Sequence, residues 1–186
     1  MIIMITRARV SGCFDSSFIA GTILLASALT GALVTGALLG LAGAAFDPVT
    51  RAVLTGLAAL AVLMGALTRP APWQLDRETD RRWLDYNDWR TAALNGFALG
   101  LGFTTRIGFW LFYAVLLAAF AIADPVLAAT GTAAYALSRV GGSLLLAAIG
   151  VEAAGRGWLP RLRTTTDAVL FAALGHLAVA LVRSLM

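Results

Sequence analysis

The feature that most constrains this chain is a succession of apolar stretches, each about as long as a lipid bilayer is thick. A helix needs about 20 predominantly apolar residues to cross the hydrocarbon core. Apolar stretches occupy residues 18–45, 52–68, 92–123, 126–150 and 168–185 of the 186 residues. Because they nearly exhaust the chain, we expect an all-α, polytopic transmembrane helical bundle of about five spans, folded as a single integral membrane domain over residues 1–186.

Composition favours the same class. Hydrophobic residues make up 60% of the chain and charged residues 13%, whereas soluble domains have about 45–50% apolar and about 25% charged residues. A soluble fold of this composition would lack the polar side chains needed to cover its surface. In a bilayer, lipid solvates that surface instead, so we expect the bilayer itself to be the first partner of this chain.

The third stretch, residues 92–123, is too long for one ordinary span. A straight helix of that length would extend about 48 Å, well beyond the hydrocarbon core. Polar and small residues interrupt it at Thr104-Thr105-Arg106-Ile107-Gly108. We therefore expect this span to be long and tilted, kinked or broken.

One substantial polar segment, the loop at residues 69–91, separates the second and third spans. It has five arginines and five acidic residues, interleaved with tryptophan and tyrosine. This pattern is typical of an amphipathic segment lying at the bilayer interface. A second interpretation is a docking surface for a partner, formed by Trp73, Arg81, Arg82, Trp83 and Trp89.

The arginines predict an orientation. With a cytoplasmic N-terminus, ten of the 14 basic residues, all of them arginine, fall on the cytoplasmic side, and only Arg51 and Arg183 fall outside. The abundance of Ala, Gly and Arg indicates a GC-rich coding sequence. We expect a multi-pass protein of a bacterial inner membrane.

Arg106 and Arg139 remain, and both lie inside predicted spans. They are 33 residues apart, in the contexts Thr-Arg-Ile-Gly and Ser-Arg-Val-Gly, so we expect them at similar depth on antiparallel helices. An arginine at mid-membrane costs about 2.5–3.5 kcal/mol even on a lenient scale. No acidic residue lies within a predicted span. Our hypothesis is a polar cavity for an anionic group, with ligand-binding residues Arg106, Arg139, His176, Thr105 and Ser138; the alternative is structural bonding to helix carbonyls.

Several kinds of chemistry are excluded or unsupported. The one cysteine, Cys13, allows no internal disulfide, and the one histidine excludes bis-histidine haem ligation within the chain. We find no catalytic triad, metal motif or phosphate-binding loop, and we predict no cofactor. The sequence pI of about 10.2 does not indicate nucleic acid, because the arginines follow membrane topology.

Three functions remain open. The first is a membrane subunit of a larger complex, or of a homo-oligomer, whose intramembrane arginines dock a partner's acidic groups or anionic lipid. The second is a transporter or channel for an anionic solute that uses Arg106 and Arg139. The third, less favoured, is a lipid- or quinone-linked enzyme. Helix packing is expected at the small-residue pairs Gly36/Gly40 and Gly96/Gly100.

Overall fold

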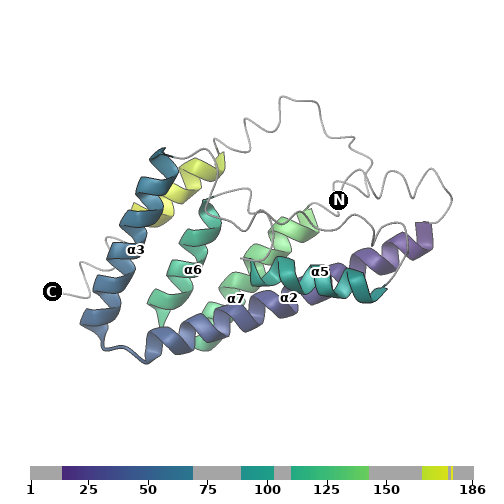
Figure 1. Cartoon of the computed structure of the whole chain (residues 1–186), viewed down its shortest axis with the longest axis horizontal. Helices are drawn as coiled ribbons and strands as arrows, with labels where there is room; N and C mark the ends of the chain where they lie inside the picture. The colour runs from purple at the N-terminus through teal and green to yellow at the C-terminus, as the bar shows by residue number, and fades with distance from the viewer. Residues whose placement is uncertain (1–13, 69–88, 103–109, 143–164, 176, 178–186) are drawn as a thin grey trace.

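The computed structural model describes residues 14–68, 89–102, 110–142, 165–175 and 177 (Figure 1). Of these residues, 94% are helical and none forms a strand. The all-α class expected from the sequence is therefore confirmed for the described part of the chain.

The two longest helices come first and are joined by a tight turn. Helix α2 is Phe14–Ala44, and α3 is Pro48–Thr68. In the turn, one carboxylate oxygen of Asp47 accepts hydrogen bonds from the backbone N–H groups of Val49 and Thr50, both at 3.0 Å. This cap, followed by a proline in the first turn, explains why α3 begins four residues before the expected position 52.

The stretch expected as the third span contains two helices. Helix α5 is Trp89–Leu101, and α6 is Leu111–Ile122. Gly102, directly after α5, has a φ of +82°, a left-handed conformation that ends a helix. A second turn, at Asp124, leads into α7, Pro125–Ala136, which continues as a short π-helix, η1, Leu137–Gly141. A further apolar helix covers Thr165–Gly175.

Helix α2 is the element on which the others assemble. It contacts α5, α6, α7 and η1, while α3 contacts α6. In Figure 1, α2 runs along the molecule, α5 and α7 lie on it, and α3 and α6 rise from its carboxyl-terminal end. Phe46 and Phe120 pack with ring centroids 5.9 Å apart, so the α2–α3 and α6–α7 turns lie at the same end of the molecule.

Glycines permit these close helix contacts. A Cβ at Gly96 would collide with Leu24 and Ser27 of α2, and one at Gly100 would collide with the Ala28 carbonyl. The contact moves from Leu24 to Ala28 in α2 as it moves from Gly96 to Gly100 in α5. Helix α5 therefore runs parallel to α2. Backbones approach this closely where small residues face each other.

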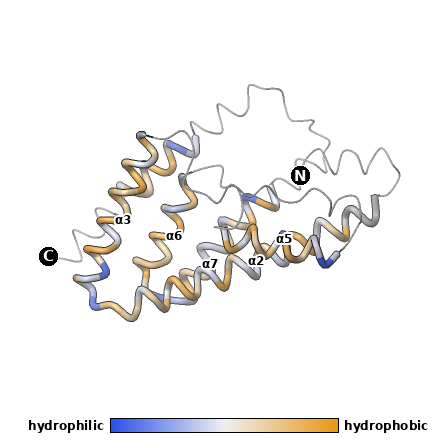
Figure 2. Tube along the Cα trace, viewed as in Figure 1, coloured by the Kyte–Doolittle hydropathy of each residue, from blue (hydrophilic) through white to orange (hydrophobic). Residues whose placement is uncertain are grey.

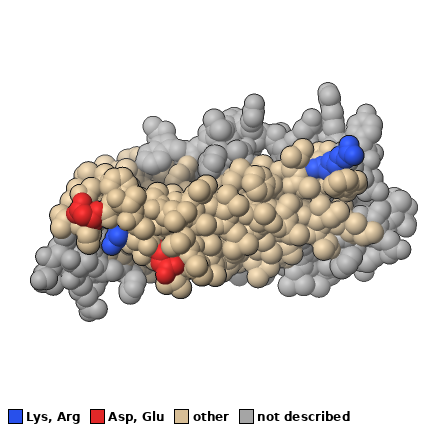
Figure 3. Space-filling model, turned by 90° about the horizontal axis from the view of Figure 1, so that it is seen from below, with Lys and Arg blue, Asp and Glu red and all other residues tan. Residues whose placement is uncertain are grey.

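Large and small residues are distributed in an unusual way. Of the 15 buried hydrophobic residues in the described ranges, eight are alanine. Many large apolar side chains point outward, and Leu57, Leu67 and Leu94 are 61%, 65% and 71% exposed. In Figure 2, orange runs along much of α3 and α6. Figure 3 shows a broad uncharged face between the few charged groups.

Two helices, at Ile19–Ala44 and Pro48–Thr68, are long and apolar enough to cross a membrane. Within the most apolar 18 residues of each helix, only 39% and 22% are buried. The core helix of a soluble protein would be mostly buried, and neither of these two helices is.

Candidate functional site

The site around Arg139 is built on α7, and the start of α7 is fixed by Asp124. One Asp124 carboxylate oxygen accepts from the backbone N–H groups of Val126 at 2.8 Å and Leu127 at 3.0 Å. Pro125 occupies the first turn, where its missing N–H breaks no helix hydrogen bond. Aspartate followed by proline therefore specifies where α7 begins.

The middle of α7 is held on α2. The Thr132 hydroxyl donates a hydrogen bond to the Ala32 carbonyl at 2.7 Å and is also 3.0 Å from the Ala128 carbonyl of its own helix. A Cβ on Gly36 would collide with the Thr132 hydroxyl and lie 2.5 Å from the Ala128 carbonyl. Gly36 therefore provides the space in which α7 lies against α2.

Arg139 lies two turns beyond Thr132, in the π-helical segment Leu137–Gly141. In a π-helix each backbone N–H bonds to the carbonyl five residues earlier, rather than four as in an α-helix. Such segments are rare overall, and those that occur are often at functional sites. The Ser138 hydroxyl donates to the Tyr135 carbonyl at 2.8 Å. The segment closes with a bond from the Gly142 N–H to the Ser138 carbonyl.

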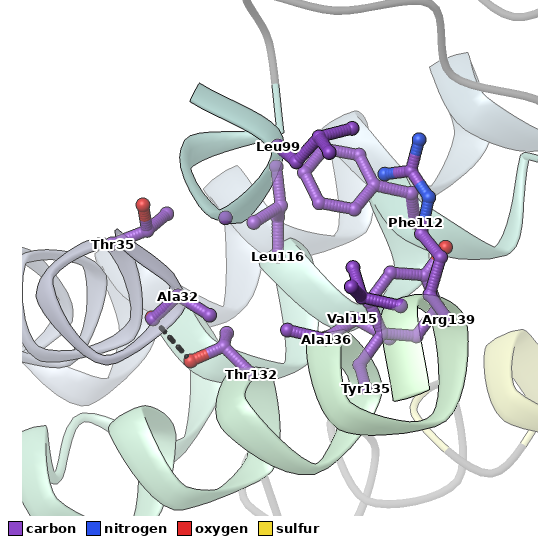
Figure 4. A pocket seen from close by; sticks show the side chains of 12 residues that line it. Ala32, Thr35, Leu99, Phe112, Val115, Leu116, Thr132, Tyr135, Ala136 and Arg139 are labelled. Atoms are coloured by element: carbon purple, nitrogen blue, oxygen red, sulfur yellow. Dashed lines mark hydrogen bonds between the residues drawn. The ribbon is translucent and has the colours of Figure 1, made fainter. Parts of the chain in front are cut away.

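Several elements meet around the Arg139 side chain, which is partly buried. Figure 4 shows its guanidinium at the edge of a pocket, near Phe112. The lining residues come from α2, α5, α6, α7 and η1 and are Ala32, Thr35, Leu99, Gly100, Phe112, Val115, Leu116, Thr132, Tyr135, Ala136, Arg139 and Val140. The cavity volume is about 10 Å³, which is enough for about one water molecule. In this conformation the site has no room for a solute.

The break in the third span forms one wall of this site. Gly102 ends α5, and a Cβ there would collide with the Phe112 ring of α6. That ring also packs against Tyr135, with centroids 5.8 Å apart. Leu99 and Gly100, in the last turn of α5, line the pocket together with Arg139.

This arrangement places a cation in the pocket that the carboxyl-terminal turn of α5 also lines. The last four carbonyls of a helix lack intrahelical partners, and the helix dipole is negative there. Such an interaction contributes about 0.3–1 kcal/mol at exposed sites and up to about 2 kcal/mol when partly buried. The described lining contains no carboxylate, and the described residues contain no group of three or more potential metal ligands. Among the described lining residues, Arg139 is the one with a charged side chain.

Several predicted site residues lie outside the described residues: Arg106, Thr105, His176, Trp73, Arg81, Arg82 and Trp83. Whether Arg106 and Arg139 share a cavity therefore stays a prediction. Ser138 is exposed and bonds to its own helix rather than into the pocket. Trp89 is 58% exposed, with the Arg90 guanidinium 5.4 Å from its ring centroid. Gly36, Gly40, Gly96 and Gly100 all lie at contacts with another helix.

Sequence reasoning missed the neighbours that shape the site. Tyr135 precedes Arg139 by one helical turn, a spacing that places two side chains on one face and could have been noticed. Thr132 lies one further turn back and carried no distinct signal. Phe112 was not foreseen, because its contact with Tyr135 depends on the break between α5 and α6.

No protein-family model, curated protein or solved structure significantly matches this chain.

Proposed function

We propose that this chain is an integral protein of a bacterial inner membrane, with about five spans and a cytoplasmic N-terminus. The support is the inverted distribution of side chains, in which alanine and glycine fill the contacts and large apolar residues face outward. Water would oppose that arrangement, whereas lipid accommodates it, because helix association in membranes relies on close packing of small residues.

The proposed orientation agrees with the two turns. Gly40 lies against Asp124 and Pro125, so the Asp47 and Asp124 turns are neighbours at one end of the bundle. That end carries Arg51, one of the two arginines assigned to the outer side, whereas Arg90 lies in the first turn of α5. Because α5 is parallel to α2, Arg90 lies toward the amino-terminal end of α2, the proposed cytoplasmic end.

Within this membrane protein, Arg139 is proposed to dock an acidic side chain of another subunit or the headgroup of an anionic lipid. The observation that carries the proposal is that Arg139 lies on a π-helical segment at the edge of a cavity too small for a solute. A guanidinium keeps its charge at all physiological pH values and matches carboxylate and phosphate groups in a two-pronged geometry. An intramembrane arginine is a functional-site hypothesis by default.

A transporter of an anionic solute is the second candidate, and one observation favours it. The third span is interrupted, and the last turn of α5 lines the Arg139 pocket. Transporters commonly bind their substrates at discontinuous helices near mid-membrane. This candidate requires a second conformation in which the cavity is much larger than about 10 Å³.

Native mass spectrometry of protein gently extracted from its own membrane separates these candidates. The docking proposal expects stoichiometric foreign polypeptides or an anionic lipid on the wild-type protein, lost from Arg139→Gln and only partly kept by Arg139→Lys. Removing one partner of a buried charge pair costs about 2–5 kcal/mol, so we expect affinity to fall at least about 30-fold. Arg51→Gln is the control. Arg51 lies in the first turn of α3, after Asp47, and this variant should keep the partner that the wild-type protein binds.

Two results contradict docking. A protein that retains the same partner in Arg139→Gln at wild-type stoichiometry does not use this residue to dock. A partner-free protein that shows anion flux in liposomes, abolished by Arg139→Gln, is a transporter instead.

A further inference from the structure

The buried residues of α7 and η1 follow one another at a fixed spacing of four. They are Ala128, Thr132, Ala136 and Val140, and none is more than 6% exposed. An α-helix turns about 100° per residue, so four residues exceed one full turn by about 40°. Three such steps in a straight α-helix would turn Val140 about 120° away from the direction of Ala128.

The contacts of α7 and η1 with α2 follow the same spacing. They pair Gly40 with Pro125, Gly36 with Ala128, Ala32 with Thr132, and Leu24 and Ala28 with Val140. The residue numbers fall along α2 as they rise along α7, so the two helices are antiparallel. Helix α7 and η1 therefore stay on α2 from the first turn of α7 to Val140, without the drift expected of a straight α-helix (Figure 1).

The π-helical segment explains how Val140 stays on α2. Each π-type hydrogen bond spans five residues instead of four, so the segment Leu137–Gly141 adds a residue without adding its 100° of rotation. This opposes the drift that the four-residue spacing builds up, and Val140 packs in one buried cluster with Leu24 and Ala28. A regular α-helix over the same residues would turn Val140 away from α2.

Val140 is the residue of η1 best placed to hold this geometry. Leu137 and Ser138 are exposed, and a Cβ at Gly141 would meet no listed atom closer than 3.4 Å. Val140, 4% exposed, is the buried residue of the segment. Helices rarely adopt the π form, so a contact outside the helix is needed to favour it here. The packing of Val140 against α2 provides that contact.

We propose that Val140 is a positioning residue for Arg139. Its packing against Leu24 and Ala28 holds the π-helical segment in one rotation, which keeps the neighbouring Arg139 guanidinium at the edge of the pocket near Phe112 (Figure 4). Without this packing the segment also adopts the α-helical form, which turns Arg139 about the helix axis. The proposal deepens the docking function proposed above and rests on it only for the effect on a bound partner.

A distance between two spin labels tests the rotation directly. The labels are attached to Gly142→Cys, directly after the segment, and Leu38→Cys of α2, in a Cys13→Ser background and in phosphatidylcholine nanodiscs. A Cβ at Gly142 meets no heavy atom within 4 Å, and Leu38 is 60% exposed, so both positions have room for a label. A helix with its side chains is about 10–12 Å wide, so a rotation of about 100° moves a side chain by about 8 Å.

Substitutions at Val140 should change this distance. The wild type should give one distance, and Val140→Ala should add a second population displaced by up to about 8 Å. Val140→Ile keeps a branched apolar side chain and should keep the wild-type distance. Val126→Ala, at a valine of α7 that is 70% exposed, is the matched control. Leu174→Ala, in the separate cluster around Trp110, should lower the unfolding temperature and leave the distance unchanged.

Deletion of Ser138 tests the π form itself. With one residue fewer, the segment becomes α-helical while Val140 keeps its place on α2, so the distance should stay close to that of the wild type. In this background Val140 no longer has a π form to hold, and adding Val140→Ala should not produce a second population. The deletion keeps the test decisive even where Val140→Ala alone does not fold.

Three results overturn the proposal. An unchanged single distance in Val140→Ala shows that Val140 does not hold the segment. A displacement of about 8 Å on deletion of Ser138 shows that the segment does not absorb an extra residue. A displaced distance in Val140→Ala, with the partner fully retained in native mass spectra, shows that the rotation does not control docking; the proposal expects the partner-bound fraction to fall toward that of Arg139→Gln.

Failure of the docking function gives a different result. A wild-type protein without any partner refutes docking, whereas the label distances still show whether Val140 sets the rotation of the segment.

Discussion

The Thr132 hydroxyl of α7 donates a 2.7 Å hydrogen bond to the Ala32 carbonyl of α2, and this bond joins segments 100 residues apart. It lies beside Gly36, whose missing side chain allows the two backbones to approach. The π-helical segment with Arg139 begins one turn after this contact. The position of the arginine is therefore set by a hydroxyl and a glycine that carry no charge.

Thr132→Val should lower stability without changing the fold. Valine has the shape of threonine but cannot donate, so the Ala32 carbonyl loses its interhelical partner. We expect a loss of about 0.5–1.5 kcal/mol, since hydrogen bonds between membrane helices contribute about 0.6 kcal/mol on average. Reversible unfolding in mixed detergent measures this loss. Thr130→Val, which breaks only a local bond, should cost less; equal losses would show that the interhelical bond contributes nothing.

Gly36→Ala should destabilise the chain more than alanine does at a glycine with open surroundings. The added methyl group would meet the Thr132 hydroxyl and the backbone of Ala128, and such overpacking costs about 1–3 kcal/mol. Gly56, in α3, has no heavy atom within 4 Å of the position that a Cβ would occupy. Gly56→Ala should therefore be neutral or stabilising by up to about 1 kcal/mol, because alanine favours helix. The same unfolding measurement compares the two variants, and similar destabilisation in both would contradict the close contact.

The sequence predicted helical class well because hydropathy and length need no tertiary information. The start of α7 at Pro125 lies within one residue of the expected position 126, whereas α3 begins at Pro48, four residues before the expected position 52. The position of the break in the third span was harder to predict from the sequence. Its sequence showed only an interruption near Arg106, whereas α5 already ends at Leu101. The described break depends on the left-handed Gly102 and the Phe112 ring beside it, which is a tertiary contact.

The candidate site could be predicted only in part from the sequence, for a related reason. Depth follows from span placement, so the sequence alone predicted Arg139 to be an intramembrane cation. Which way its side chain faces depends on the rotation of η1, and a π-helical segment shifts that rotation.

Gly102→Ala should destabilise the junction between α5 and α6. Its φ of +82° is unfavourable for residues with a Cβ, at a cost of about 1–2 kcal/mol, and the added methyl group would collide with the Phe112 ring. Gly142→Ala is the control, because its surroundings are open. In the double variant with Phe112→Ala, the steric part of the loss should disappear and the conformational part should remain. A double variant without any such coupling would contradict the predicted contact.

Asp47 predicts a specific pH dependence of stability. Hydrogen bonds from the Thr50 hydroxyl and from the Thr50 and Val49 N–H groups hold the pKa of this exposed carboxyl below its ordinary value of 3.8. A carboxyl whose pKa is lowered by folding stabilises the folded state above its unfolded pKa. That contribution is lost as pH falls from about 3.8 through the lower, folded-state pKa.

Asp47→Asn retains a good helix cap without a titrating group. Between pH 5 and pH 2, the wild type should therefore lose more stability than Asp47→Asn, and the other acidic groups cancel in the comparison. Thermal unfolding in a detergent without ionisable groups measures the difference, and parallel pH profiles for the two proteins would show that the Asp47 charge does not stabilise the turn.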